Sequence, residues 1–306
     1  MAEGAPLMVR VGFIGLGAMG EPMARALLRA GFAVTACAHR RREALERLTS
    51  QGAAQASDPA GVAERSDLVA ICVPDAPQVE DVLFGERGVE RGARNGSLAI
   101  DMSTISPIAS RRFARRLRER GIGFVDAPVS GGPQRAESGT LTIMAGGDDA
   151  DVSRALPVLR ALGTPTHLGG VGMGETVKLV NQAIIANVML GNVEALVLAQ
   201  RLGAQRDAVR SVLATATASN YLLEQWLPKT WFAGTFDGGF SMDLLRKDLA
   251  AALDAAGAIE YAMPATANAY ALFTAASSHG NGALDYSAIA NDYERTDRNA
   301  QARNVS

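Results

Sequence analysis

The chain has 306 residues, a formal net charge of −2 and an apolar content of 48%. This length suits about two ordinary domains, and the small charge gives no reason to expect nucleic-acid binding. No apolar run approaches the roughly 18–20 residues of a membrane helix. Residues 1–7 lack the basic and apolar segments of a signal peptide. Because Cys37 and Cys72 are not at disulfide-scaffold spacing, we expect a protein of the reducing cytoplasm, without a membrane partner.

The first half of the chain alternates short apolar runs with amphipathic stretches. Continuous apolar strands that alternate with helices predict a parallel sheet covered on both faces. The predicted strands are Val9–Ile14, Ala33–Ala38, Leu68–Val73, Leu98–Asp101, Phe124–Asp126 and Leu141–Ala145, and the predicted helices are Met19–Ala30, Arg41–Ser50, Pro107–Arg120 and Asp149–Leu162.

After Gly174 the pattern predicts only helices. They are Glu175–Leu202, Arg206–Thr215, Tyr221–Trp226, Ser241–Gly257, Met263–Ser278 and a short one around Ser287–Arg295. The first of them is apolar almost all the way round, which is typical of a buried helix. We expect it to run between the domains and to be covered partly by a second subunit.

The first predicted strand leads directly into the turn Gly15-Leu16-Gly17-Ala18-Met19-Gly20 and then into a helix. In a dinucleotide site the first glycine permits the tight turn, the second lets the backbone approach a pyrophosphate, and the third allows close helix–strand packing. The order of strand, turn and helix favours this reading over an ordinary tight turn. We therefore predict an α/β Rossmann-type domain over residues 8–170, then an all-helical domain over 171–306, joined by a long interdomain helix at about 175–202.

The choice of dinucleotide depends on the end of the second predicted strand. An NAD site usually has an acid there that binds the ribose hydroxyls, whereas this chain continues with His39-Arg40-Arg41-Arg42 and has no acid before Glu43. Such a cluster suits a 2′-phosphate, so we expect NADP, with NAD as the alternative. The cluster could also be a solvated basic helix start.

Two further segments suggest a substrate site. The Ser130-Gly131-Gly132 turn exposes consecutive backbone N–H groups that suit a carboxylate, although it could be an ordinary loop. Lys178 shares one helix face with Asn181 and Gln182. An amine among apolar residues is costly to bury unless it is paired or used, and burial favours its neutral form. The alternative is a solvated lysine near a helix start.

Six motifs in the same order resemble the β-hydroxyacid dehydrogenase family, over about Val9 to Tyr293. This family includes 3-hydroxyisobutyrate dehydrogenase, tartronate semialdehyde (2-hydroxy-3-oxopropionate) reductase and glyoxylate/succinic semialdehyde reductase. The motifs are the glycine turn, Val73-Pro74-Asp75, Asp101-Met102-Ser103-Thr104, Asp126-Ala127-Pro128-Val129-Ser130-Gly131-Gly132, the helix Gly172-x-Gly174-x-x-x-Lys178-x-x-Asn181, and Phe240 with Lys247-Asp248-Leu249.

The resemblance implies a role for each matching position. Lys178 would be the catalytic acid/base, and the substrate carboxylate would lie on Ser130, Gly131 and Gly132 with help from Asn181. The cofactor would contact Val73, Pro74, Gln78, Thr104, Phe240 and Lys247, besides the residues of the glycine turn and the basic cluster. The family's usual assembly is a homodimer or homotetramer, and no metal is implied.

The chain also departs from the family pattern. Small residues usually follow the Ser-Gly-Gly turn, whereas this chain has Pro133-Gln134-Arg135. The pair Asn181-Gln182 is more like the tartronate semialdehyde reductases. We therefore expect an enzyme similar to 2-hydroxy-3-oxopropionate reductase or 3-hydroxyisobutyrate dehydrogenase, with a glyoxylate/succinic semialdehyde reductase as one alternative. A non-catalytic dinucleotide-binding sensor or scaffold is an alternative of another class.

Overall fold

The computed structural model describes residues 9–39, 42–237 and 239–295. The chain divides into two compact units, Met1–Lys178 and Leu179–Ser306. Because the division falls inside a helix, each unit is described by itself. The domain boundary expected between residues 170 and 171 stays a prediction.

The first unit contains a six-stranded sheet with the strand order β3-β2-β1-β4-β5-β6. Its strands are β1 (Arg10–Ile14), β2 (Ala33–Cys37), β3 (Ala54–Gln55), β4 (Leu68–Ile71), β5 (Leu98–Asp101) and β6 (Gly123–Asp126). Every neighbouring pair is parallel, which confirms the predicted sheet. This is the strand order of dinucleotide-binding folds, in which ligands bind beyond the carboxyl ends of the strands where the order reverses. Here that point lies at β1 and β4.

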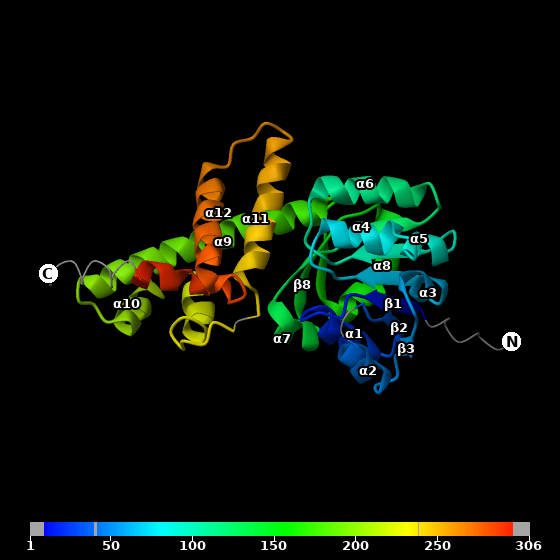
Figure 1. Ribbon diagram of the computed structural model, residues 1–306, viewed down its shortest axis with the longest axis horizontal. Helices are drawn as coiled ribbons and strands as arrows, with labels where there is room; N and C mark the ends of the chain where they lie inside the picture. The colour runs from blue at the N-terminus through cyan, green and yellow to red at the C-terminus, as the bar shows by residue number, and fades with distance from the viewer. Residues whose placement is uncertain (1–8, 40–41, 238, 296–306) are drawn as a thin grey trace. The chain divides into compact units, whose positions relative to one another are not determined.

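Helices cover both faces of this sheet (Figure 1). The first face is covered by α1 (Gly20–Arg29), α2 (Arg42–Thr49) and α8 (Asp149–Leu162), whose apolar side chains pack with Phe13 and Ile100. The opposite face is covered by α3 (Pro59–Glu64), α4 (Ala76–Phe84), α5 (Val89–Gly92) and α6 (Pro107–Arg118), which pack on Ile71. The sequence pattern missed α3, α4 and α5.

A second, three-stranded sheet completes the first unit. It consists of β7 (Val129–Ser130), β8 (Leu141–Ala145) and β9 (Gly163–His167), and the short helix α7 (Gly132–Glu137) joins β7 to β8. The strand predicted at Leu141–Ala145 exists, but the prediction that it extends the parallel sheet was wrong. The chain reverses after β6, and β8 then pairs antiparallel with β7 and parallel with β9.

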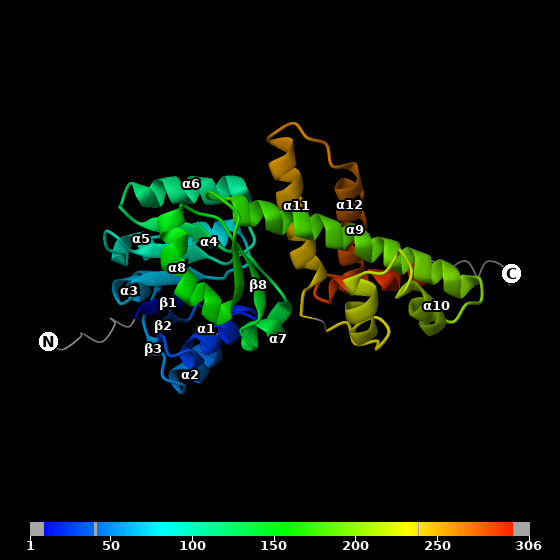
Figure 2. The same cartoon turned by 180° about the vertical axis from the view of Figure 1, so that it is seen from behind.

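The long helix α9 (Met173–Arg201) has 29 residues and is therefore about 43 Å long. The second unit continues with α10 (Arg206–Leu213), α11 (Met242–Gly257) and α12 (Pro264–Ala276), and with the short helices η1 (Leu222–Trp226), η2 (Leu227–Lys229), η3 (Ser277–Asn281) and η4 (Tyr286–Ile289). Both views show α11 beside α12 (Figures 1 and 2). The core of the second unit contains Leu196 of α9, Leu245 of α11 and Phe273 of α12. The described part of this unit contains no strand, as predicted.

Among the described residues, α9 is the one helix whose length and composition would allow it to cross a membrane. The expectation that no segment approaches a membrane span was therefore too strict. The apolar stretch of this helix is 44% buried within the protein, and core helices of globular proteins can have the same length and composition. The finding is weak evidence for a membrane span.

Candidate functional site

The turn between β1 and α1 needs two of its glycines for close packing. A Cβ on Gly15 (φ +98°) would lie 2.1 Å from the carbonyl oxygen of Cys72, and one on Gly20 would lie 1.8 Å from that of Gly15. Gly17 differs, because a Cβ there would meet no atom within 4 Å. Packing inside the protein therefore does not require Gly17, whereas close approach of a ligand to the backbone would. No side chain caps the start of α1, so its first N–H groups can face an anion.

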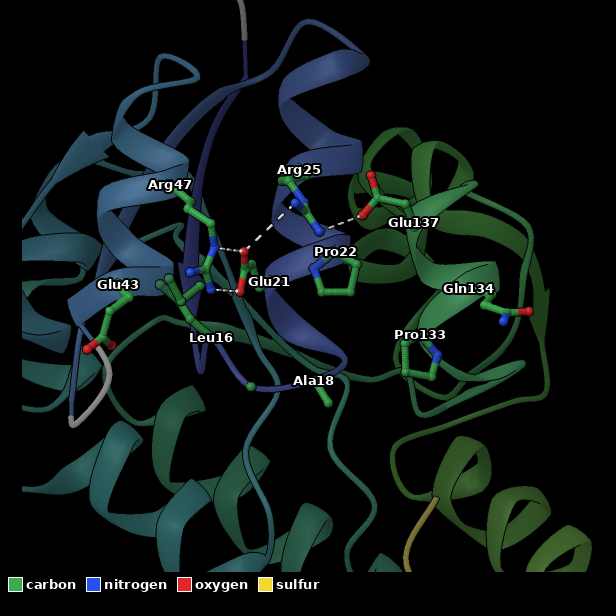
Figure 3. A pocket seen from close by; sticks show the side chains of 12 residues that line it. Leu16, Ala18, Glu21, Pro22, Arg25, Glu43, Arg47, Pro133, Gln134 and Glu137 are labelled. Atoms are coloured by element: carbon green, nitrogen blue, oxygen red, sulfur yellow. Dashed lines mark hydrogen bonds and ion pairs between the residues drawn. The ribbon is translucent and has the colours of Figure 1, made fainter. Parts of the chain in front are cut away.

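A cavity of about 690 Å³ opens beside this turn, between α1, α2 and α7 (Figure 3). This volume is within the usual range for small-molecule sites. Leu16, Gly17 and Ala18 contribute the turn itself, and the other lining residues include Glu43, Arg47, Pro133 and Gln134. The glycine turn predicted from the sequence therefore borders a space that can accept part of a dinucleotide.

The arginines of this cavity are already engaged. The Arg47 guanidinium donates two hydrogen bonds to Glu21, of 2.7 and 2.8 Å. Arg25 lies 3.0 Å from Glu137 and 3.9 Å from Glu21. The hydrogen bond from Arg47, opposed by burial, lowers the pKa of Glu21. These ion pairs link α1 to α2 and α7, so neither arginine is the obvious phosphate ligand.

The ends of β1, β4 and β5 bring further predicted cofactor residues together. A Cβ on Gly15 would lie 2.9 Å from Cγ1 of Val73, so the glycine turn adjoins the segment after β4. The Val73 N–H donates to Oγ of Ser103 (3.1 Å), the neighbour of half-buried Thr104. Exposed Pro74 and Gln78 follow along the chain. These residues therefore gather at the point where the strand order reverses.

Of the basic cluster His39-Arg40-Arg41-Arg42, the structure describes only the first and the last residue. His39 is exposed after the end of β2, and Arg42 is exposed at the start of α2. Arg40 and Arg41 lie outside the described residues. Their predicted contact with a 2′-phosphate stays a prediction.

Asp126 fixes the start of α9. It is fully buried at the end of β6, and its carboxylate accepts the N–H of Gly172 (2.7 Å) and of Glu175 (2.9 Å). A Cβ on Gly174 would lie 2.2 Å from the carbonyl oxygen of Met144, so this glycine permits the close approach of the helix to the sheet. Burial raises the pKa of Asp126, and the hydrogen bonds from Gly172 and Glu175 oppose that rise. The carboxylate thus takes the place of a helix N-cap.

The motif that contains Asp126 does not by itself indicate this role. A signal was available, because Gly170-Val171-Gly172-Met173 offers no Ser, Thr, Asp or Asn to cap such a long helix. The missing cap had to come from elsewhere in the chain. Which residue supplies it could not be read from local sequence.

Lys178 lies one turn into α9 and is only 7% exposed, so it is not a solvated lysine. Glu175 is fully buried and lies three residues earlier, on the same helix face. Asp126 also precedes Ser130 by four residues, at most about 14 Å of extended chain. The residue that anchors the helix of Lys178 is therefore close in the chain to the Ser130 turn.

The Ser130-Gly131-Gly132 turn forms the junction of β7 and α7. Gly131 has φ +140° and Gly132 has φ +71°, both in the region that favours glycine. Because Gly132 opens α7, its N–H is among the donors that a helix leaves without an internal partner. Carboxylate binding at this turn stays a prediction.

A buried polar chain in the second unit joins two other predicted residues. Asn181 donates to Gln182 (2.9 Å), Gln182 donates to Asp248 (2.6 Å), and Nζ of Lys247 lies 2.7 Å from the same Asp248 carboxylate. Gln182 and Asp248 are 1% and 2% exposed. Sequence reasoning assigned no function to either. These hydrogen bonds and the ion pair fix α9 to α11 and orient both Asn181 and Lys247.

Phe240 lies just before α11. Its ring contacts that of Tyr286 edge to face, with 5.7 Å between the ring centroids. Over the residues that the structure describes, no group of three or more His, Cys, Asp or Glu side chains could hold a metal ion.

Comparison with known proteins agrees with this geometry. Residues 10–174 match the model of the NAD binding domain of 6-phosphogluconate dehydrogenase, and residues 172–293 match that of the NAD-binding region of NADP-dependent 3-hydroxyisobutyrate dehydrogenase. The chain is 42% identical to 2-hydroxy-3-oxopropionate reductase of Escherichia coli K12, over 92% of this chain and 96% of that one. It is 38% identical to 2-(hydroxymethyl)glutarate dehydrogenase of Eubacterium barkeri, over 94% and 95%.

A solved structure of Mycobacterium tuberculosis 3-hydroxyisobutyrate dehydrogenase with L-serine is also similar. The TM-score is 0.86 at 30% identity, over 94% of this chain and 99% of that one. The fold and the glycine turn define an NAD(P)-dependent oxidoreductase. The chain belongs to the β-hydroxyacid dehydrogenase family. This confirms the family resemblance and the prediction that the protein is an enzyme, which was favoured over a non-catalytic sensor.

Proposed function

We propose that this enzyme interconverts a small carboxylate-bearing semialdehyde and its β-hydroxy acid, with 2-hydroxy-3-oxopropionate as the first candidate substrate. The main support for the proposal is the burial of Lys178 in α9. Asp126 anchors the start of this helix to the sheet. The 42% identical relative supports the choice of substrate. The 3-hydroxyisobutyrate, glyoxylate and succinic semialdehyde reactions are alternatives for the same site.

Each part of the chain has a task in this reaction. The N–H groups at Gly131 and Gly132, with Asn181, bind the substrate carboxylate. A nicotinamide cofactor held at the glycine turn would supply, or in the oxidative direction accept, the hydride. In the reductive direction the Lys178 ammonium gives a proton from Nζ to the substrate oxygen, and in the oxidative direction the neutral amine takes it back. The proton and the hydride together account for the reduction of one carbonyl group.

We further propose that residues 8–170 bind the cofactor, preferably NADP, and that residues 171–306 serve substrate binding and oligomerisation. Val73, Pro74, Gln78 and Thr104 would contact the cofactor together with the glycine turn, and Lys247 and Phe240 would contribute from the helical part. Cytoplasmic location is part of the proposal, since Cys37 and Cys72 are not at disulfide-scaffold spacing.

Replacement of Lys178 by Ala should lower kcat about 10²- to 10⁴-fold, the usual contribution of a general acid or base. Lys178→Arg should fail as well, because a guanidinium does not readily release its proton. Steady-state kcat and the Kd for NADPH should be measured for each variant, with exposed Lys229→Ala as the matched control. Retention of more than about a tenth of kcat by Lys178→Ala would exclude this role, and parallel loss of cofactor binding would make Lys178 structural.

NADPH should give a higher kcat/KM than NADH, because the cluster from His39 to Arg42 can pair with a 2′-phosphate. Neutral replacements of Arg40 and Arg41 should weaken NADPH more than NADH. The kcat/KM for both cofactors should be measured for the wild type and the double variant. A wild type that prefers NADH would show that the cluster is solvated surface.

A homo-oligomer should form through α9, which leaves large apolar side chains exposed, among them Val180 (54%), Ile184 (57%) and Leu198 (58%). Such a stripe is unusual for the solvent face of a helix. Light scattering at micromolar concentration should therefore give a dimer or tetramer mass. A stable mass of 32.0 kDa, that of one chain, would contradict the proposal.

A further inference from the structure

The side chain of Arg135 lies directly against the Ser130-Gly131-Gly132 turn. A Cβ placed on Gly131 would be 2.8 Å from Cδ, 2.9 Å from Cβ and 3.2 Å from Nε of Arg135. This direction follows from helix geometry, because side chains tilt toward the helix N-terminus and Arg135 lies three residues into α7. The guanidinium is therefore held beside the turn that would bind the substrate carboxylate.

Arg135 lies in the last turn of the six-residue helix α7. In the part of the chain that the structure describes, its guanidinium makes no hydrogen bond or ion pair. The acid of the same helix, Glu137, is already paired with Arg25 and Arg29. The stretch around Gly131 thus presents a positive charge to which no described acidic side chain is paired.

The cofactor cavity does not explain this charge. Pro133, Gln134 and Glu137 form the face of α7 that lines the cavity beside the glycine turn (Figure 3). Ala136 is fully buried in the core. Arg135 is exposed on the remaining face, and its side chain runs along Gly131 instead of into the cavity.

We propose that Arg135 is a substrate-binding residue that pairs with the acid group seated on the Gly131–Gly132 turn. This inference rests on the proposed function, which places that acid group there. The N–H groups of the turn carry no net charge, whereas a guanidinium supplies a full charge and a planar fork that matches a carboxylate. Arg135 would thus make the enzyme selective for aldehydes with a terminal carboxylate over neutral aldehydes of the same size.

Two aldehydes that differ only in the carboxylate can test whether Arg135 binds that group. Glyceraldehyde differs from 2-hydroxy-3-oxopropionate only in having a hydroxymethyl group where the acid has its carboxylate. Arg135→Gln should lower kcat/KM for the acid about tenfold or more, mainly through KM, since hydrogen bonds to charged groups have this strength. The kcat/KM for glyceraldehyde and the KM for NADPH should not change. Arg135→Lys should recover part of the activity on the acid.

Arg120→Gln is the matched control, because Arg120 is also exposed and has no side-chain partner among the described residues. Thermal unfolding of each variant should match the wild type. If the wild type prefers the acid and Arg135→Gln keeps the same preference, the proposal for Arg135 is contradicted, whereas the proposed function is not. Equal losses on both aldehydes, or a raised KM for NADPH, would also overturn it. A wild type without any preference for the acid would contradict the proposed function as well.

Discussion

The hydrogen bonds from Gly172 and Glu175 to Asp126 are the contact on which the rest of the site depends. They satisfy two backbone N–H groups at the start of a 29-residue helix and fix that helix to the end of β6. Lys178 lies one turn further on, so its position follows from the same contact. Because the Ser130 turn begins four residues after Asp126, the proposed carboxylate site follows the same end of β6.

The chemistry of the chain agrees with this reading of Lys178. Three of its 30 Lys and Arg residues are lysines: Lys178, Lys229 and Lys247. The chain therefore relies on arginine for its surface charge and ion pairs, and two of its lysines occur at predicted site positions. Arginine stays protonated at every working pH, whereas lysine can exchange a proton once its environment favours the neutral amine. A buried lysine in an arginine-rich chain is thus better suited to proton transfer than to charge pairing.

Local sequence predicted much of the fold. The helix Asp149–Leu162 was predicted to the residue, and the glycine turn has the geometry that its spacing requires. The strand β9 (Gly163–His167) was missed, because Gly-Thr-Pro-Thr-His has neither an apolar run nor alternation, and this strand forms only by pairing with β8. The partners of Asp126 and of Gln182 were missed for a related reason. They lie 46 and 66 residues away, and no local pattern specifies such pairings.

Comparison of Asp126→Ala with Asp126→Asn tests whether the Asp126 carboxylate positions Lys178. Unfolding free energies, kcat and the Kd for NADPH should be measured for both variants. Asp126→Ala leaves two buried N–H groups without an acceptor and should lower the free energy of unfolding by about 2–4 kcal/mol, whereas the side-chain oxygen of Asn can still accept one of them. We expect kcat to fall in the order wild type, Asp126→Asn, Asp126→Ala, while NADPH binding changes little. An Asp126→Ala enzyme with wild-type stability and wild-type kcat would contradict this expectation.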